Sequence, residues 1–411
     1  MIQTSYALRK HLIPGIALLL GLMTVISGCR QSELSQTSLE SVPLSATPPP
    51  TSPPTPAIAE AQLLAVGDIM MHLPQTQSGY NPQTKTYNFD GFFTEVKPIL
   101  SQGDWVIGNL ETPLAGASAR FTGYPLFNAP DELADALKGA GFNILTTANN
   151  HSLDRQELGV INTLVTLRNR GIIAVGTALS AVEAQDIITV EKKGISMALL
   201  AYTYGTNGIP IPQGKDYLVS LIDEPKIVKD ILAARRMGVD LVTVALHFGD
   251  EYQRHPNQGQ KQLVQQLVGA GADIILGSHP HVVQPYQIFE VPTQQGKTRK
   301  AVAIYSMGNF ISNQVGNDKD LGVIFAVNVE KQLGENTTEI KEVEAIPTWV
   351  HRYRANGQLN YRVLPLESVI MAKNDPLLVP GQYSQLEQFL NRMNDHIHSL
   401  NPAFEIRVST P

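Results

Sequence analysis

The sequence predicts an α/β protein, and two observations support this prediction. Short apolar runs typical of buried strands alternate along the chain with helix-like segments of about ten to fifteen residues. Several of these runs end abruptly in residues that carry carboxylate, amide or imidazole groups. Because ligands bind at the carboxyl ends of strands in open α/β sheets, this pattern also indicates where a functional site would lie.

The composition is typical of a globular protein. The chain has 411 residues, of which 43% are hydrophobic, so it can build a substantial core. Its net charge of -6 provides no general attraction to nucleic acid, and we expect no nucleic-acid partner. No phosphate-cradling glycine loop or serine-centred nucleophile elbow is present, so a nucleotide cofactor is not indicated.

Residues 1–29 have the order of a bacterial lipoprotein signal peptide. Basic residues precede the apolar run 13–25, and the segment ends in Ile-Ser-Gly-Cys29. In such a processing box Cys29 becomes the lipid-carrying first residue, and as the only cysteine it can form no intramolecular disulfide. The alternative is an uncleaved anchor, although Pro14 and Gly21 interrupt a run that is already short for a membrane span. Both readings predict an exported protein held at a bacterial membrane, on its periplasmic or extracellular face.

The rest of the chain divides into a tether, a domain and an extension. Residues 30–61 are rich in Ser, Thr and Pro, which predicts a disordered, extended tether. The main domain is expected over residues 62–345. Residues 346–411 are expected to add a strand and a helix packed on the same domain, and Ser384 with Glu387 predicts a capping box where that helix begins.

The first two strands of the domain each lead into an acidic residue. Residues 62–66 form a short buried strand followed by a glycine and Asp68, a common way to present a metal ligand. His72 lies just beyond, as a substrate group or as an ordinary loop histidine. The strand 105–108 leads to Glu111, which either bridges two metal ions or forms an ion pair at a helix start.

The next strand, 142–147, leads into a dense polar segment. An asparagine carbonyl such as that of Asn150 can bind a metal ion, and His151 beside it can transfer a proton during hydrolysis. The alternative is a helix cap, because the segment precedes a helix expected over 156–170, and Asp154 is the predicted cap. Both interpretations can hold together.

Three histidines follow two later strands. The strand 241–246 leads to His247, and the strand 273–276 leads to His279 and His281. Single histidines usually bond to the backbone, but three at neighbouring strand ends favour a metal site. Imidazole mixed with carboxylate and amide oxygen predicts one or two divalent ions, with manganese, iron and zinc as the candidates.

The remaining elements complete the expected α/β pattern. Asn309 follows a central strand over 301–306 and either holds substrate or makes a turn. Strands over 321–329 and 339–345 suggest a second sheet. Further strands are expected over 171–176, 194–204, 282–289 and 349–364, and further helices within 87–100 and over 130–140, 224–237 and 258–269.

The strand-end motifs, in this order, resemble the capsule-synthesis CapA family, which is associated with poly-γ-glutamate production. The resemblance covers roughly residues 62–330. The motifs are Gly67-Asp68-Ile69-Met70, Gly108-Asn109-Leu110-Glu111, Ala148-Asn149-Asn150-His151-Ser152-Leu153-Asp154, His247-Phe248-Gly249-Asp250-Glu251-Tyr252, Gly277-Ser278-His279-Pro280-His281-Val282 and Ser306-Met307-Gly308-Asn309-Phe310.

That family is similar in turn to the calcineurin-like metallophosphoesterases, which implies a four-layer α/β/β/α sandwich with a two-metal site. The resemblance implies metal ligands at Asp68, Glu111 (bridging), Asn150, His247, His279 and His281, with His151 as the proton donor. The sequence departs from the phosphoesterase pattern at three positions. Met70 replaces the histidine of the Asp-x-His opening, Glu111 replaces an aspartate, and Ser278 separates the glycine from the histidine pair.

The resemblance implies a cell-surface, metal-dependent hydrolase of an anionic envelope polymer, such as poly-γ-glutamate or a related amide or phosphoester. His151 and Glu251 are the expected catalytic residues, and Asn149, Asn309 and His72 are expected to contact substrate. The alternative is a non-catalytic polymer-binding, assembly or retention subunit of a membrane polymer synthase, which Met70 supports. A solute-binding protein would need two similar lobes, whereas the sequence shows one continuous motif series.

Overall fold

The computed structural model of the chain describes residues 57–401 apart from 293–295, 297, 336 and 356. The predicted signal peptide with Cys29, most of the tether and the end of the C-terminal extension lie outside the described residues. None of the helices within the described part is long and apolar enough to cross a membrane.

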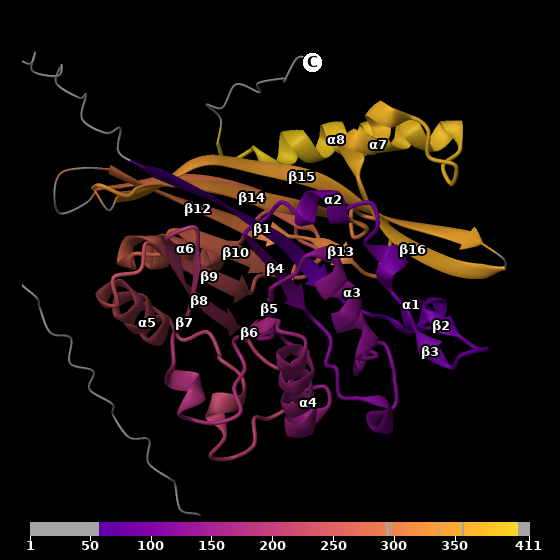
Figure 1. Cartoon of the computed structure of the whole chain (residues 1–411), viewed down its shortest axis with the longest axis horizontal. Helices are drawn as coiled ribbons and strands as arrows, with labels where there is room; N and C mark the ends of the chain where they lie inside the picture. The colour runs from indigo at the N-terminus through magenta and orange to yellow at the C-terminus, as the bar shows by residue number, and fades with distance from the viewer. Residues whose placement is uncertain (1–56, 293–295, 297, 336, 356, 402–411) are drawn as a thin grey trace, which may run out of the picture. The chain divides into compact units, whose positions relative to one another are not determined.

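Two β-sheets stack face to face, and helices cover their outer faces (Figure 1). The first sheet has the strand order β16-β15-β14-β1-β4-β5-β6, with β13 paired to β1. Its strands are β1 (Ile58–Ile69), β4 (Trp105–Leu110), β5 (Ile144–Thr146), β6 (Ile173–Val175), β13 (Asn309–Ile311), β14 (Leu321–Gln332), β15 (Thr337–Ala355) and β16 (Gln358–Pro365).

The second sheet has the order β11-β12-β10-β9-β8-β7. Its strands are β7 (Ile188–Lys192), β8 (Ile195–Thr203), β9 (Leu241–His247), β10 (Ile274–Ser278), β11 (Val283–Pro292) and β12 (Thr298–Met307). The helices are α1 (Leu73–Ser78), α2 (Lys97–Leu100), α3 (Glu132–Ala140), α4 (Gln156–Asn169), α5 (Glu224–Arg236), α6 (Gln258–Ala270), α7 (Leu366–Ala372) and α8 (Pro380–Ile397), and β2 (Tyr80–Asn81) with β3 (Thr86–Tyr87) forms a small hairpin.

Side-chain alternation along the strands creates the layers. In β1, Leu63 faces the core between the sheets, whereas Leu64 faces the apolar cluster that includes residues of α3. In β8, Leu199 faces the inter-sheet core and Leu200 faces the cluster formed with α5 and α6. Because each sheet buries both faces, the strands read as continuous apolar runs. The predicted α/β/β/α sandwich is confirmed.

Pairing with distant strands changes two predicted boundaries. β1 begins at Ile58, inside the predicted tether, because residues 58–61 pair with the end of β14. The strands predicted over 321–329 and 339–345 do not form a separate sheet. They lie in β14 and β15 and extend the first sheet, because β14 pairs antiparallel with β1.

The last helix closes one end of the inter-sheet core. Leu386 and Met393 of α8 are buried in that core, and the helix contacts β11 and β15 (Figure 1). Its start was predicted incorrectly from the Ser384 capping box. The helix begins one turn earlier at Pro380, because proline suits the first helical position, where no backbone donor is needed.

Candidate metal centre

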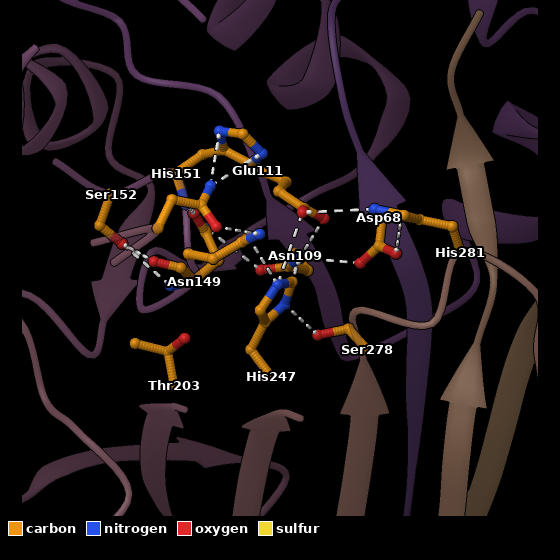
Figure 2. Close-up of polar contacts among 12 residues, drawn as sticks. Asp68, Asn109, Glu111, Asn149, His151, Ser152, Thr203, His247, Ser278 and His281 are labelled. Carbon is orange, nitrogen blue, oxygen red and sulfur yellow. Dashed lines mark hydrogen bonds and ion pairs between the residues drawn. The ribbon is translucent and has the colours of Figure 1, made fainter. Parts of the chain in front are cut away.

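The carboxyl ends of parallel strands from both sheets meet at one place. Asp68 at the end of β1 lies in register with Asn109 of β4, and His247 at the end of β9 lies in register with Ser278 of β10. Glu111 follows β4 directly. Figure 2 shows these side chains, from strands far apart in the sequence, directed toward one another.

Three sets of residues have donor atoms within 4.8 Å of one another; two contain only predicted ligands, and the third includes Glu251, which was predicted to be catalytic. Glu111 belongs to two of them, and its role as a carboxylate that bridges two ions stays a prediction. Asn150 Oδ1 lies 3.0 Å from His247 Nε2 and therefore adds an amide oxygen beside one set. The sets are Glu111, His247 and His279; Asp68, Glu111 and His281; and Glu251, His279 and His281.

The charges of the site favour a cation. Asp68 and Glu111 are both 0% exposed, and Glu111 Oε1 has no hydrogen-bond partner among the described residues. Burial raises the pKa of Glu111 well above its ordinary value, and the neighbouring charge of Asp68 raises it further. Burial also lowers the pKa of His247, with a further effect from His279. Two buried carboxylates beside neutral imidazoles form a donor set that fits a divalent ion.

The backbone that carries the histidine pair is strained. His279 and His281 have φ values of 102° and 57°, a region that non-glycine residues rarely adopt. Such residues cost about 1–3 kcal/mol each and occur mainly where function requires them. Pro280 between them accepts a hydrogen bond from Tyr252 N at 2.8 Å, which ties this turn to the loop after β9. Burial lowers the pKa of His279 to about 4, so its imidazole is neutral near pH 7.

Asn109 organises the acidic side of the site, a role that the sequence did not reveal. Its amide Nδ2 donates to Asp68 Oδ1 at 2.9 Å and to Glu111 Oε2 at 3.3 Å (Figure 2). Its Oδ1 accepts from Thr146 Oγ1 at 3.2 Å. The signal was its place inside the second strand-end motif, two residues ahead of the predicted ligand Glu111.

Ser278 is a second residue whose role the sequence did not reveal. Its Oγ lies 2.9 Å from His247 Nδ1. When Nδ1–H of His247 donates to this hydroxyl, Nε2 carries no proton. The free lone pair of Nε2 then lies near Glu111 Oε1, which is 3.4 Å away. Ser278 thus holds the imidazole of His247, whose role as a metal ligand stays a prediction.

His151 forms a buried pair with Asp154. Its Nδ1 lies 2.7 Å from Asp154 Oδ2, which also accepts from Phe127 N at 2.7 Å. The prediction of Asp154 as a helix cap was wrong, because α4 has Arg155 at its N-cap position and no side-chain cap. The carboxylate instead holds the Nδ1 proton of His151 and leaves Nε2 available for proton transfer.

Two further predicted site residues lie at the margin of the centre. Glu251 is exposed, and its carboxylate belongs to the donor set of His279 and His281. His72 is half-buried, accepts a hydrogen bond from Asn313 N at 3.3 Å, and has a pKa lowered to about 4 by burial. Their catalytic and substrate roles stay predictions.

The two asparagines predicted to bind substrate use their amides to hold loops. Asn149 Nδ2 donates to Leu110 O at 2.8 Å, and its Oδ1 accepts from His151 N at 3.1 Å. Asn309 Nδ2 donates to Lys319 O at 2.7 Å and to His281 O at 3.3 Å. These contacts position neighbouring residues of the site, and direct contact with substrate stays a prediction for both.

Comparison with known proteins places this fold and site in a family. Residues 62–314 match the family described as bacterial capsule synthesis protein PGA_cap. The PGA biosynthesis protein CapA of Bacillus subtilis (strain 168) is 31% identical over 252 residues, which cover 61% of this chain and 62% of that protein. The capsule biosynthesis protein CapA of Bacillus anthracis is 31% identical over 261 residues, which cover 61% of this chain and 59% of that protein.

The alignments thus span about three-fifths of the length of these relatives. Among solved structures, NAD nucleotidase of Haemophilus influenzae aligns with a TM-score of 0.44 and 12% identity, over 82% of this chain and 60% of that one. The family match covers more than half of the chain and contains every residue assigned to the centre. The chain therefore belongs to the bacterial capsule synthesis protein PGA_cap family.

Proposed function

We propose that this protein is a metal-dependent hydrolase of an anionic envelope polymer, with poly-γ-glutamate or a related amide or phosphoester as substrate. Membership of the capsule-synthesis family supports the polymer class. The signal-like start of the sequence supports action outside the cytoplasmic membrane, with a lipid on Cys29 as the anchor. Subunits of a membrane polymer synthase are the proposed partners.

One observation carries the proposal: two buried carboxylates, three imidazoles and an amide oxygen converge on one place, and Glu111 is shared between two donor sets. We assign Asp68, Glu111, Asn150, His247, His279 and His281 as the residues that would hold one or two ions of manganese, iron or zinc. A divalent ion bound there would lower the pKa of a water ligand and polarise a carbonyl or phosphoryl group.

The chain's own residues supply the proton transfer. Asp154 fixes the imidazole of His151 through Nδ1, so Nε2 is the atom that can pass a proton to the leaving amine or alkoxide. The amide of Asn207 lies 3.4 Å from that Nε2 and limits the rotation of the ring. Glu251, exposed beside His279 and His281, is placed to accept the proton that the attacking water loses.

A second candidate function is favoured by Met70. This residue is 2% exposed and occupies the position where an Asp-x-His opening would carry an imidazole. A thioether is a softer donor than an imidazole and suits a hard ion such as manganese poorly. The chain would then bind polymer at the centre and act as a retention or assembly subunit without turning the polymer over.

The experiment that separates the two candidates measures metal, binding and turnover on the same purified protein. We expect elemental analysis to show retained transition metal, and we expect cleavage of poly-γ-glutamate or a phosphodiester after addition of Mn²⁺, Fe²⁺ or Zn²⁺. Asp68→Ala and His247→Ala serve as inactive controls. Polymer binding without cleavage supports the second candidate, and a protein that retains neither metal nor polymer contradicts both.

A further inference from the structure

The loop after β13 carries a lysine to the edge of the candidate metal centre. The ammonium of Lys319 lies 5.1 Å from the centroid of the Tyr252 ring. That ring in turn lies 6.0 Å, centroid to centroid, from the imidazole of His281. Lys319 is half-buried and Tyr252 is 45% exposed, so the pair lies beside a metal-binding residue and still faces solvent.

The two acidic residues next to this lysine in the sequence are paired with other groups. Asp318 forms ion pairs with Arg254 at 3.2 Å and with Arg392 at 2.6 Å. Asp320 accepts a hydrogen bond from Trp349 Nε1 at 3.1 Å. Within the described part of the chain, Lys319 has no ion pair of its own. Its charge is therefore available to a ligand.

The backbone of Lys319 is held by Asn309, a residue that is in register with the predicted ligand Asp68. Asn309 pairs with Asp68 across β13 and β1, and its amide donates to the backbone carbonyls of both Lys319 and His281. One side chain thus fixes the spacing between the lysine loop and the histidine turn. This contact restrains the backbone of Lys319, while the Tyr252 ring is the contact of its ammonium group.

We infer that Lys319 and Tyr252 form a subsite for a carboxylate of the polymer beside the metal centre. This inference rests on the proposed function and names the part of the substrate that is recognised. Every residue of a γ-linked glutamate chain carries a free carboxylate near its amide bond. Because the exposed carboxylate of Glu251 lies beside the centre, a polymer carboxylate that binds there needs a cation to offset the repulsion, and the ammonium of Lys319 supplies three donors for it.

The test compares Lys319→Gln and Lys319→Arg with the wild-type protein, and uses Lys229→Gln as the matched control. Lys229 is exposed on α5, remote from the strand ends. Dissociation constants are measured in Mn²⁺ for poly-γ-glutamate and for its methyl ester. We expect Lys319→Gln to weaken binding of the free acid roughly tenfold, the size of one charge-assisted hydrogen bond, and to leave binding of the ester unchanged.

The other variants and conditions make the outcome specific. Lys319→Arg keeps the charge and should bind the free acid within about threefold of wild type, and raised salt should reduce the difference between Lys319→Gln and wild type. Metal content should be equal in all variants. Equal binding of the acid by Lys319→Gln and wild type, or equal weakening for acid and ester, overturns the inference while the proposed function stands. Wild-type protein that binds neither metal nor polymer overturns the proposed function and the inference with it.

Discussion

Replacing Glu111 by glutamine should have opposite effects on the metal-free and metal-bound protein. In the metal-free protein, Glu111 and Asp68 are two fully buried carboxylates joined by the amide of Asn109. Two full charges 4 Å apart would cost about 4 kcal/mol at an effective dielectric constant near 20. The raised pKa of Glu111 relieves part of this cost by protonation, so we expect the substitution to stabilise the metal-free protein by roughly 1–2 kcal/mol.

The sign of the pH dependence follows from the raised pKa of Glu111. A carboxyl group with a higher pKa in the folded than in the unfolded state contributes stability at low pH, and this contribution is lost as the pH rises through the folded value. The gain from Glu111→Gln should therefore be larger at pH 8 than at pH 5. Glu191→Gln, on the exposed strand β7, is the control and should show no such trend.

With metal bound, the wild-type protein should be more stable than Glu111→Gln, which is the reverse of the order expected without metal. An ion at a hundred times its dissociation constant stabilises the folded state by about 2.7 kcal/mol, which raises Tm by about 5 °C in a domain of this size. Glu111→Gln should lose most of this shift, because Glu111 belongs to two of the three donor sets. The assay is thermal unfolding of chelator-treated protein with and without Mn²⁺ or Zn²⁺. A variant that keeps the full wild-type shift would refute the assignment of Glu111 as a shared ligand.

Three further predictions test other parts of the structure. Asn109→Ala should destabilise the metal-free protein by about 2–4 kcal/mol, because two buried carboxylates lose a hydrogen-bond donor. Urea unfolding measures this loss, and a loss below about 1 kcal/mol would contradict the organising role of Asn109. Asp154→Asn should lower kcat roughly 10- to 100-fold at unchanged metal content, and unaltered turnover would remove Asp154 from the mechanism. His351, 2% exposed beside Arg362, has a pKa lowered by burial to about 4, so wild-type stability should fall as the pH drops from 6.5 to 4. His351→Gln should reduce that fall by about 2–3 kcal/mol, measured as urea midpoints at both pH values.

The strand ends could be predicted because the signal is local. A buried apolar run that stops at Asp68 or His247 indicates both the strand and the edge where its last side chain lies. Parallel pairing then predicts Asp68 beside Asn109 in the first sheet and His247 beside Ser278 in the second, which the strand registers confirm. That these two edges meet depends on how the sheets stack. The family resemblance was confirmed by the match over residues 62–314.

The remaining features depend on partners that no local pattern identifies. An aspartate ahead of a helix usually caps it, whereas the carboxylate of Asp154 bonds to the His151 ring and to the backbone N–H of Phe127. Residues 58–61 join β1 because they pair antiparallel with the end of β14, a strand that is far away in the sequence. Lys319 sits in a loop whose composition resembles any polar turn, and the contact from Asn309 becomes visible only in three dimensions.

The pairing of β1 with β14 also has a consequence for how the molecule is assembled in time. Leu63 pairs with Trp105 of β4 on one side but with Val327 of β14 on the other, so β1 lacks its second neighbouring strand until most of the polypeptide has been synthesised. Contacts between residues this distant in the sequence slow folding, so the growing chain stays unfolded for longer. A truncated product that stops before β13 would hold all six proposed liganding residues and yet lack β14, β15 and β16, which complete the first sheet.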